Sequence, residues 1–284
     1  MKIAEDLQRA FDGGTMPVMS DRYELLEKIA EGGRAVIWSA LDRDTGRQVA
    51  FKRLSSSSPP AEGQREIEIL RAVRHPSIVS LLDAGADGQG DFWVMELLQG
   101  GTLESNAPLA LEGFESLARQ SLAALAAVHR AGWLHRDVKP GNLMQTETGD
   151  WKLIDFGLAC RRDAEIENQM TGSVHYMAPE QFQNAVLDER ADVYALGGTF
   201  YHALTGRPPF EGETTPQVIT AHLYQRPKPL CELRPDVPAR TAGLIHRMLA
   251  RLPEERPATV AEIQVFLGFE PHQGLPVDTS ATTA

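Results

Sequence analysis

The sequence lacks an excess of basic residues. Its 284 residues include 28 Lys and Arg against 39 Asp and Glu, which gives a formal net charge of −11. Proteins that bind nucleic acid usually carry a basic excess that neutralises phosphates. The charge balance therefore argues against nucleic acid as a partner.

Long apolar runs are also missing. A helix that crosses a bilayer needs about 20 consecutive, mostly apolar residues, and the most apolar stretch, Ser121 to Val128, is much shorter. Residues 1–14 contain three acids and no apolar run, so they do not resemble a secretory signal. We therefore expect no membrane contact within this chain.

Cysteine is scarce as well. Cys160 and Cys231 cannot build a disulfide framework, and scarce cysteines fit a reducing setting, so we expect a cytoplasmic location. The composition, 42% hydrophobic and 24% charged, is that of an ordinary globular protein. A chain of this length can bury a sizeable core without disulfides or metals.

The pattern along the chain changes character near residue 100. Residues 23–54 predict three antiparallel strands with a turn at 44–46, and residues 64–73 a helix. Two further strands are expected at 77–85 and 91–97. Later segments are mostly helical, at residues 114–131, 191–205, 216–224, 239–249 and 260–267. The pattern indicates the α+β class, with a small antiparallel β lobe, one main helix in it, and a larger helical lobe.

Both ends of the chain look like additions. Residues 1–20 form an N-terminal appendage in which 3–11 have helical apolar spacing and Gly13-Gly14 ends the pattern. This helix could pack on the main body, bind a partner, or be disordered. Residues 269–284 are polar and predict a disordered tail.

Four motifs follow one another in the middle of the chain. Residues 135–142 read His-Arg-Asp-Val-Lys-Pro-Gly-Asn, and Asp155-Phe156-Gly157 follows thirteen residues later. Ala178-Pro179-Glu180 comes after them, and Val49-Ala50-Phe51-Lys52 lies upstream on a predicted strand. Their order, spacing and context resemble the eukaryotic-like Ser/Thr protein kinases over residues 21–268, and the stretch around residues 178–210 is most similar to the bacterial branch.

The resemblance implies a bilobal protein kinase fold with an N-lobe at residues 21–95, a hinge at 96–101 and a C-lobe at 102–268. It also implies ATP-dependent phosphorylation of Ser and Thr hydroxyls in protein substrates, including autophosphorylation. ATP and Mg²⁺ are the expected cofactors.

Catalytic roles follow from the motif positions. The resemblance makes Asp137 the base that accepts the hydroxyl proton and Lys139 the contact to the transferred phosphate. Asn142 and Asp155 offer the oxygen ligands that Mg²⁺ prefers. Ser173 stands where the family has a threonine that supports the lysine, and its hydroxyl can make the same hydrogen bond.

Lys52 is the candidate ligand of the α- and β-phosphates. In the family it is held by a glutamate on the next helix. Glu66 is the better match and Glu68 the competitor, although two residues along a helix point to different faces.

The phosphate-covering loop departs from its pattern. Ala30 and Ala35 replace two of three glycines, while Gly32 and Gly33 remain, so nucleotide binding could be weakened. The residues expected to contact the nucleotide are Ile29, Gly32, Gly33, Ile37, Ala50, Lys52, Met95, Glu96, Leu98 and Met144.

Other motif residues look structural. Asp192 is expected to anchor the backbone of the catalytic loop from a buried helix, and Glu180 to form a buried ion pair with Arg256. An apolar stack is expected from Leu70, Leu81, His135 and Phe156.

The segment 158–170 contains no Ser, Thr or Tyr. In the family, the arginine at the position of Arg136 often pairs with a phosphate on this segment. We hypothesise that Asp163, Glu165 or Glu167 replaces that phosphate. Alternatively, these acids are simply solvated.

Two other functions compete with an active protein kinase. A nucleotide-binding pseudokinase that acts as an interaction module is favoured only by Ala30 and Ala35. A kinase of small molecules generally lacks the segment found here at 178–180. Gly141 and Thr102 stand where kinases that select basic substrates have acids, so the sequence does not predict an arginine-directed substrate.

Overall fold

The computed structural model describes residues 22–55, 60–162, 164, 172–183 and 185–270. The expected appendage 1–20, with its helix 3–11, lies outside the described residues, as does the expected tail except for residues 269 and 270. Contacts divide the described chain into two compact units. The smaller contains residues 22–55 and 82–97, and the larger contains 60–81 and 98–270.

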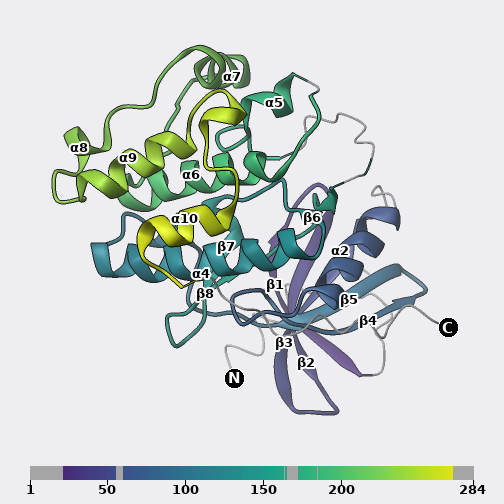
Figure 1. Ribbon diagram of the computed structural model, residues 1–284. Coiled ribbons are helices and arrows are strands. Elements are labelled where there is room, and N and C mark those ends of the chain that lie inside the picture. The colour runs from purple at the N-terminus through teal and green to yellow at the C-terminus, as the bar shows by residue number, and fades with distance from the viewer. Residues whose placement is uncertain (1–21, 56–59, 163, 165–171, 184, 271–284) are drawn as a thin grey trace. The chain divides into compact units, whose positions relative to one another are not determined.

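The smaller unit is built on a five-stranded sheet with the order β1-β2-β3-β5-β4. Its strands are β1 (Tyr23–Glu31), β2 (Ala35–Asp42), β3 (Arg47–Leu54), β4 (Leu81–Asp87) and β5 (Gly90–Glu96). The pairs β1–β2, β2–β3 and β3–β5 are antiparallel. Figure 1 shows the strands as labelled arrows.

An aromatic cluster forms the core of this sheet. The rings of Phe51 and Phe92 stack with centroids 4.8 Å apart, and Tyr23 packs edge-on against Phe92. These side chains are buried together with Val49 and Val94. Aromatic pairs in offset or tilted geometry bury a large apolar area, so this cluster links β1, β3 and β5.

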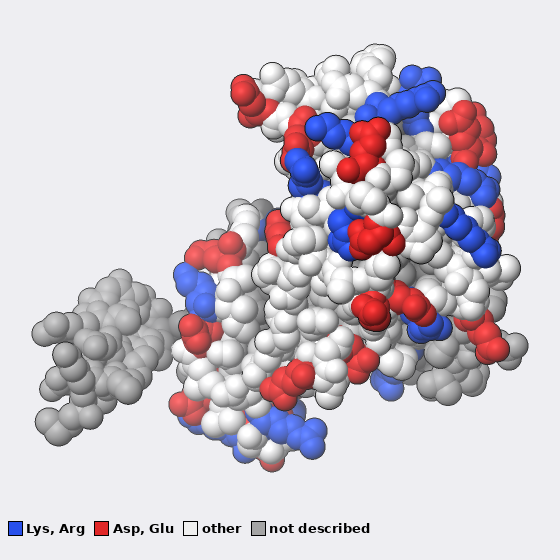
Figure 2. All heavy atoms as spheres, turned by 90° about the vertical axis from the view of Figure 1, so that its left-hand side faces the viewer, with Lys and Arg blue, Asp and Glu red and all other residues white. Residues whose placement is uncertain are grey.

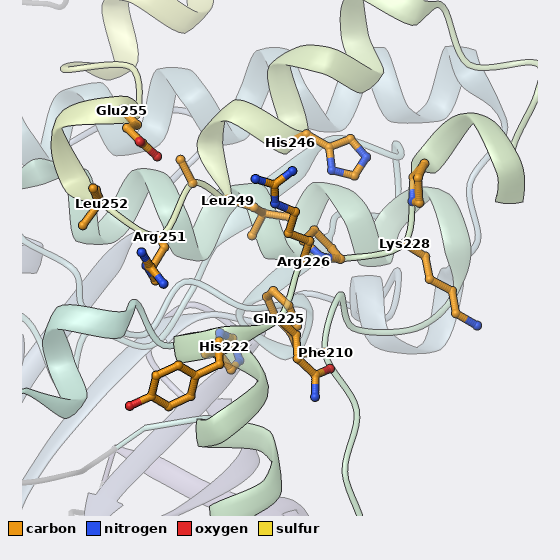
Figure 3. Close-up of a pocket in the computed structure, with 14 residues that line it drawn as sticks. Phe210, His222, Gln225, Arg226, Lys228, His246, Leu249, Arg251, Leu252 and Glu255 are labelled. Atoms are coloured by element: carbon orange, nitrogen blue, oxygen red, sulfur yellow. The ribbon is translucent and has the colours of Figure 1, made fainter.

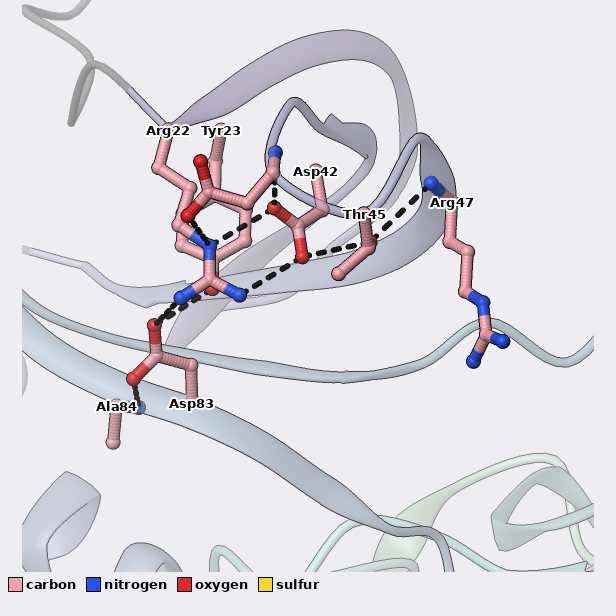
Figure 4. Close-up of polar contacts among 8 residues, drawn as sticks. Arg22, Tyr23, Asp42, Thr45, Arg47, Asp83 and Ala84 are labelled. Carbon is pink, nitrogen blue, oxygen red and sulfur yellow. Dashed lines mark hydrogen bonds and ion pairs between the residues drawn. The ribbon is translucent and has the colours of Figure 1, made fainter.

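Charged residues tie the first strand to two others at the edge of the core (Figure 4). Arg22 donates to both carboxylate oxygens of Asp42 at 2.9 Å, and to Asp83 at 3.2 Å. The hydroxyl of Tyr23 donates to Asp83 at 2.7 Å. The hydrogen bonds from Arg22 hold the pKa of the Asp42 carboxyl well below its usual range.

The larger unit is mainly helical. Its helices are α2 (Pro60–Ala72), α3 (Leu103–Asn106), α4 (Leu111–Arg130), α5 (Pro179–Phe182), α6 (Glu189–Thr205), α7 (Thr215–Tyr224), α8 (Leu230–Leu233), α9 (Ala239–Met248) and α10 (Val260–Leu267). Two short 3-10 turns, η1 (Pro140–Asn142) and η2 (Pro253–Glu255), and the strands β6 (Trp133–Leu134), β7 (Leu143–Gln145), β8 (Trp151–Leu153) and β9 (Cys160–Arg161) complete it.

Helix α6 is the centre of the larger unit. Nearly all its residues are buried, which is expected of a helix that is apolar on every side. Asp188 caps its start by accepting a hydrogen bond from the backbone of Arg190, and Gly206 ends it with φ of 75°, a conformation that favours glycine. Helices α4 and α9 pack against it (Figure 1), so α6 can present side chains to the interior of the unit.

The fold class is confirmed as α+β, with a five-stranded antiparallel sheet followed by helices. Residues 60–81, which we expect in the N-lobe from the sequence, group with the larger unit. Among the described residues, no helix is both long enough and apolar enough to cross a membrane. On the face that Figure 2 presents, acidic and basic side chains are interspersed.

Candidate active site

A side chain on helix α6 holds the start of the catalytic segment, residues 135–142, through hydrogen bonds to its backbone. The carboxylate of Asp192 accepts hydrogen bonds from the backbone N–H of His135 at 2.8 Å and of Arg136 at 2.7 Å. Its third hydrogen-bond partner is Nε2 of His129, also at 2.8 Å. The expected anchoring role of Asp192 is therefore confirmed. Arg136 has φ of 66°, a costly conformation for a residue with a side chain, and the bonds to Asp192 stabilise it.

Asp192 must remain ionised to do this. Burial raises its pKa, but the hydrogen bonds from His129 and from the backbone of His135 outweigh that effect and leave the pKa below its ordinary value. A fully buried carboxylate is tolerated only when several donors satisfy it. The three donors at Asp192 meet that condition.

The side chains of Asp137, Lys139 and Asn142 lie together. Oδ2 of Asp137 accepts from Nζ of Lys139 at 2.7 Å and from the amide of Asn142 at 3.1 Å. Its other oxygen, Oδ1, accepts from the backbone N–H of Ser173 at 3.2 Å. The contact of Ser173 with this cluster thus runs through its backbone to Asp137. A carboxylate fixed by these three donors is pre-oriented to receive a proton.

Asn142 and Asp155 are suited to hold a divalent cation. The amide nitrogen of Asn142 donates to a backbone oxygen and a side-chain oxygen of Asp137, which leaves the amide oxygen of Asn142 as the ligand atom. The backbone N–H of Ile154 donates to the carbonyl of Asn142 at 2.9 Å, and Asp155 follows with φ of 61°.

Among the described residues, no group of three or more His, Cys, Asp or Glu could hold a metal ion without further help. A Mg²⁺ site made from one or two side chains, waters and substrate phosphates has no such requirement. The two oxygen donors therefore fit this ion.

Helix α2 turns its two candidate glutamates to different environments. Glu66 is buried, and one of its carboxylate oxygens lies 3.4 Å from the point where a Cβ on Gly157 would stand. Glu68 is half exposed and pairs with Arg161 at 2.7 Å. Because Glu66 lies beside the Asp155–Gly157 motif while Glu68 has a surface partner, the structure favours Glu66 for the expected role.

Lys52 lies in the smaller unit, on β3. Its side chain is buried, and its ammonium stands 5.1 Å from the centroid of the Trp93 ring. Such a cation–π contact stabilises a charge that has been removed from water. A buried lysine of this kind is suited to an anionic ligand.

The expected phosphate-covering loop joins β1 to β2. Ala30 lies inside the paired strand, opposite Ile37, so only residues 32–34 form the turn. A Cβ at Gly33 would meet nothing within 4 Å, and at Gly32 its nearest neighbour would be 3.9 Å away. Neither glycine has a positive φ. The fold of the unit therefore does not require glycine at these positions, whereas a ligand that approaches the backbone closely would.

The other expected nucleotide contacts divide between the units. Ala50 pairs with Met95 across β3 and β5, and Glu96 ends β5 in the smaller unit. Ile29 on β1 is half exposed. Leu98 and Met144 belong to the larger unit, where Leu98 is buried and Met144 lies on β7.

Two of the structural contacts expected in the larger unit are present. Arg256 donates to both carboxylate oxygens of Glu180, at 2.6 and 2.8 Å, and the pair is buried. The rings of His135 and Phe156 meet edge-on with centroids 4.8 Å apart, and burial lowers the pKa of His135, so this ring is neutral. The ion pair expected between Glu180 and Arg256 is confirmed.

The sequence did not reveal the position of Glu104. Its carboxylate, on α3, lies 3.2 Å from the point where a side chain on Gly141 would begin. An acid therefore stands beside the catalytic segment although position 141 has none.

Only part of the segment that follows Gly157 lies within the described residues. Asp163, Glu165 and Glu167, proposed as partners of Arg136, lie outside the described residues. Cys160 is buried, and burial raises the pKa of its thiol. A protonated, buried thiol reacts slowly with oxidants, which favours a structural role for Cys160.

Comparison with known proteins agrees with this geometry. The protein kinase domain model matches residues 23–265. The chain belongs to the protein kinase family. The expected resemblance is thereby confirmed, and the relatives below are bacterial.

Three of these relatives are named serine/threonine-protein kinases. PknA of Mycobacterium tuberculosis is 37% identical over 84% of this chain and 58% of its own length. The DNA damage-responsive kinase RqkA of Deinococcus radiodurans is 34% identical over 87% of this chain, and a probable kinase of Clostridium acetobutylicum is 33% identical over 87%. The chain spans 39% of the length of each of the last two relatives.

Proposed function

We propose that this chain transfers the γ-phosphoryl group of ATP to Ser and Thr hydroxyls of protein substrates, its own included. The observation that carries the proposal is the cluster in which Lys139 and Asn142 both donate to Asp137. It is supported by membership of the protein kinase family and by the names of the relatives. A cytoplasmic location and a partner for residues 3–11 stay predictions.

Each side chain has a defined task in this reaction. As the acceptor oxygen forms its bond to the γ-phosphorus, its proton passes to the carboxylate of Asp137. The bond from the γ-phosphorus to the bridging oxygen of ADP breaks, and Lys139 offsets charge on the phosphoryl oxygens. Asp137 is ready for this because its orientation is already fixed by its donors.

The family implies a divalent metal, and we propose Mg²⁺, held by the amide oxygen of Asn142 and the carboxylate of Asp155. When bound, it supplies positive charge that neutralises the phosphates. Lys52 and Glu66 are proposed to orient the α- and β-phosphates. The remaining nucleotide contacts are proposed at the positions named from the sequence. Treatment with EDTA should abolish transfer, and added Mg²⁺ should restore it.

The test compares wild type with Asp137→Asn. Both are incubated with Mg-ATP and a generic protein substrate, and phosphorylated residues are mapped by mass spectrometry. Asparagine cannot accept the proton, so transfer should fall by about 10²-fold or more. The affinity for a fluorescent ATP analogue, measured by titration, should change little.

Three results would argue against the proposal. Nucleotide binding without transfer by wild type would favour the pseudokinase. Transfer that is insensitive to Asp137→Asn would remove the assigned base. Products phosphorylated only on tyrosine would contradict the role of Lys139.

A further inference from the structure

A pocket of about 840 Å³ opens in the larger unit, away from the catalytic segment in sequence. It is formed by the end of α7, the segment that follows it to residue 229, the end of α9 and residues 249–255 (Figure 3). Pockets of this size accommodate ligands or several side chains of a bound peptide. Nothing in the proposed reaction uses it.

The floor of the pocket is largely apolar and closely packed. Phe210, Leu249 and His222 are buried lining residues. Nδ1 of His222 is bonded to the hydroxyl of Tyr194 at 2.7 Å, and the aromatic ring of Phe210 lies 4.6 Å from the His222 ring. The floor is therefore preformed, which lowers the entropic cost of binding.

The rim of the pocket is basic. Arg226, Lys228 and Arg251 are exposed lining residues, while Glu255 is the acid among the lining residues. Figure 3 shows Arg226 near the middle of the view and Lys228 extending toward its edge. A chain with a net charge of −11 thus gathers three cations around one opening.

These cations differ from their neighbours in what they contact. Arg247 on α9 pairs with Glu262 at 2.6 Å, and Arg234 pairs with Asp236 at 2.7 Å. Within the part of the chain that the structure describes, Arg226, Lys228 and Arg251 have no carboxylate at ion-pair distance. Arg251 makes one long contact, at 3.5 Å, to the carbonyl of Leu223. The positive charge of the rim is therefore available to a ligand.

We propose that this pocket docks an acidic segment of a protein substrate, with an apolar side chain on Phe210 and Leu249 and carboxylates at Arg226 and Arg251. Guanidinium groups match carboxylates in geometry, and an apolar anchor in a preformed pocket is the usual centre of a protein contact. The proposal rests on the proposed function only in naming a substrate as the source of the segment. The segment would be recognised by its negative charge and by one apolar side chain that enters the pocket.

Binding is tested with the full chain and a fluorescein-labelled peptide in which Glu and Asp flank a Phe-Leu pair. Fluorescence anisotropy should show saturable binding that weakens with added salt. The double variant Arg226→Glu, Arg251→Glu should bind at least tenfold more weakly. Arg130→Glu, a single charge reversal at an exposed position at the end of α4, should bind like wild type. Circular dichroism confirms that each variant is folded.

Two control ligands separate the docking of a segment from the binding of a simple anion. A peptide with Ser-Ser in place of Phe-Leu should bind several-fold more weakly. Equal binding of both peptides, with full competition by inorganic phosphate, would indicate an anion site only and overturn the proposal. Sedimentation of the unliganded chain adds a check, because self-association lost in the double variant would assign the pocket to a second copy and equally overturn it.

A kinetic arm distinguishes this inference from the proposed function. Joining the acidic segment to a serine-containing peptide should lower KM for wild type several-fold with little change in kcat, and the double variant should lose this advantage. An unchanged KM would overturn docking of a substrate. If wild type transfers no phosphate at all, the proposed function fails, and the anisotropy measurement still decides whether the pocket binds an acidic segment.

Discussion

The smaller and larger units use the same arginine–carboxylate geometry in different surroundings. Arg22 binds Asp42 through two hydrogen bonds, with the arginine side chain 40% exposed. Arg256 binds Glu180 in the same way, with the arginine side chain completely buried. If Arg22 is lost, Asp42 keeps the backbone N–H of Asp44 and the hydroxyl of Thr45 as donors, whereas both hydrogen bonds described for the Glu180 carboxylate come from Arg256. Loss of the arginine should therefore cost more at the second pair than at the first.

Arg256→Met should lower the stability of the protein more than any other substitution considered below. It leaves the carboxylate of Glu180 buried without its partner, and losing one side of such a pair costs about 3–5 kcal/mol of unfolding free energy. Arg22→Met is the matched control and should lower the thermal midpoint much less. Calorimetry of both variants measures the difference. Equal midpoints would mean that burial does not separate the two pairs.

Asp192→Asn tests the anchor of the catalytic segment. Asparagine offers one oxygen where two backbone N–H groups now find a carboxylate, so one buried donor loses its partner, at a cost of about 1–3 kcal/mol. The conformation at Arg136 should relax and kcat should fall more than the affinity for nucleotide. Denaturant unfolding and steady-state kinetics measure the two effects. An unchanged kcat would show that the anchor does not position Asp137.

As the pH is lowered, the larger unit should lose stability before the smaller one. The smaller unit contains no histidine, while burial lowers the pKa of four histidines in the larger unit, that of His222 to about 4. In the unfolded chain a histidine takes up a proton below about pH 6.5. Between pH 6.5 and 4 the unfolded state therefore binds more protons, and stability falls as the pH falls.

His222→Gln removes one of these groups. Between pH 6.5 and 5, this variant should lose about 1–2 kcal/mol less unfolding free energy than wild type. Urea unfolding at a series of pH values measures this slope. The lowered pKa of Asp42 acts in the smaller unit only at lower pH, because its stabilising effect is lost as that carboxylate becomes protonated. A slope identical to that of wild type would contradict the assignment of His222.

Gly33→Ala should have the smallest effect on stability and a selective effect on function. A Cβ at this position has open space around it, so the unfolding free energy should change by no more than that of a surface substitution, about 0.5 kcal/mol. If the turn approaches a nucleotide, KM for ATP should rise several-fold. An unchanged KM would argue that the turn does not contact ATP. Gly243→Ala, on α9, is the control for the KM measurement. A Cβ there also meets open space, and KM for ATP should stay unchanged.

Much of the fold was predictable because its helices are strongly periodic. The helix at Val260–Leu267 has the predicted bounds, and the one predicted at 239–249 ends one residue earlier. The strand predicted at 77–85 is only partly right, since β4 spans Leu81–Asp87. Ile78 instead forms an isolated parallel bridge to Leu153 in the larger unit. Apolar alternation predicts a strand but does not choose its partner.

The candidate site was predictable where roles attach to motifs. Asp137, Lys139 and Asn142 fall within eight consecutive residues, so their proximity follows from a short chain segment. The position of Glu104 could not be predicted, because it depends on α3 lying against Gly141 from a distant part of the sequence. The basic pocket has the same origin, since its lining residues come from separate segments of the chain.

The sequence by itself determined the family and the order of most elements, and it predicted the residues proposed to carry the chemistry, because short-range spacing and helical periodicity are local properties. Only the tertiary structure decided which of Glu66 and Glu68 is buried, how Asp192 holds the catalytic segment and where cations surround a pocket. Those outcomes depend on burial and on partners that are far apart in sequence. Burial sets how strongly each charge interacts, and no local pattern records it.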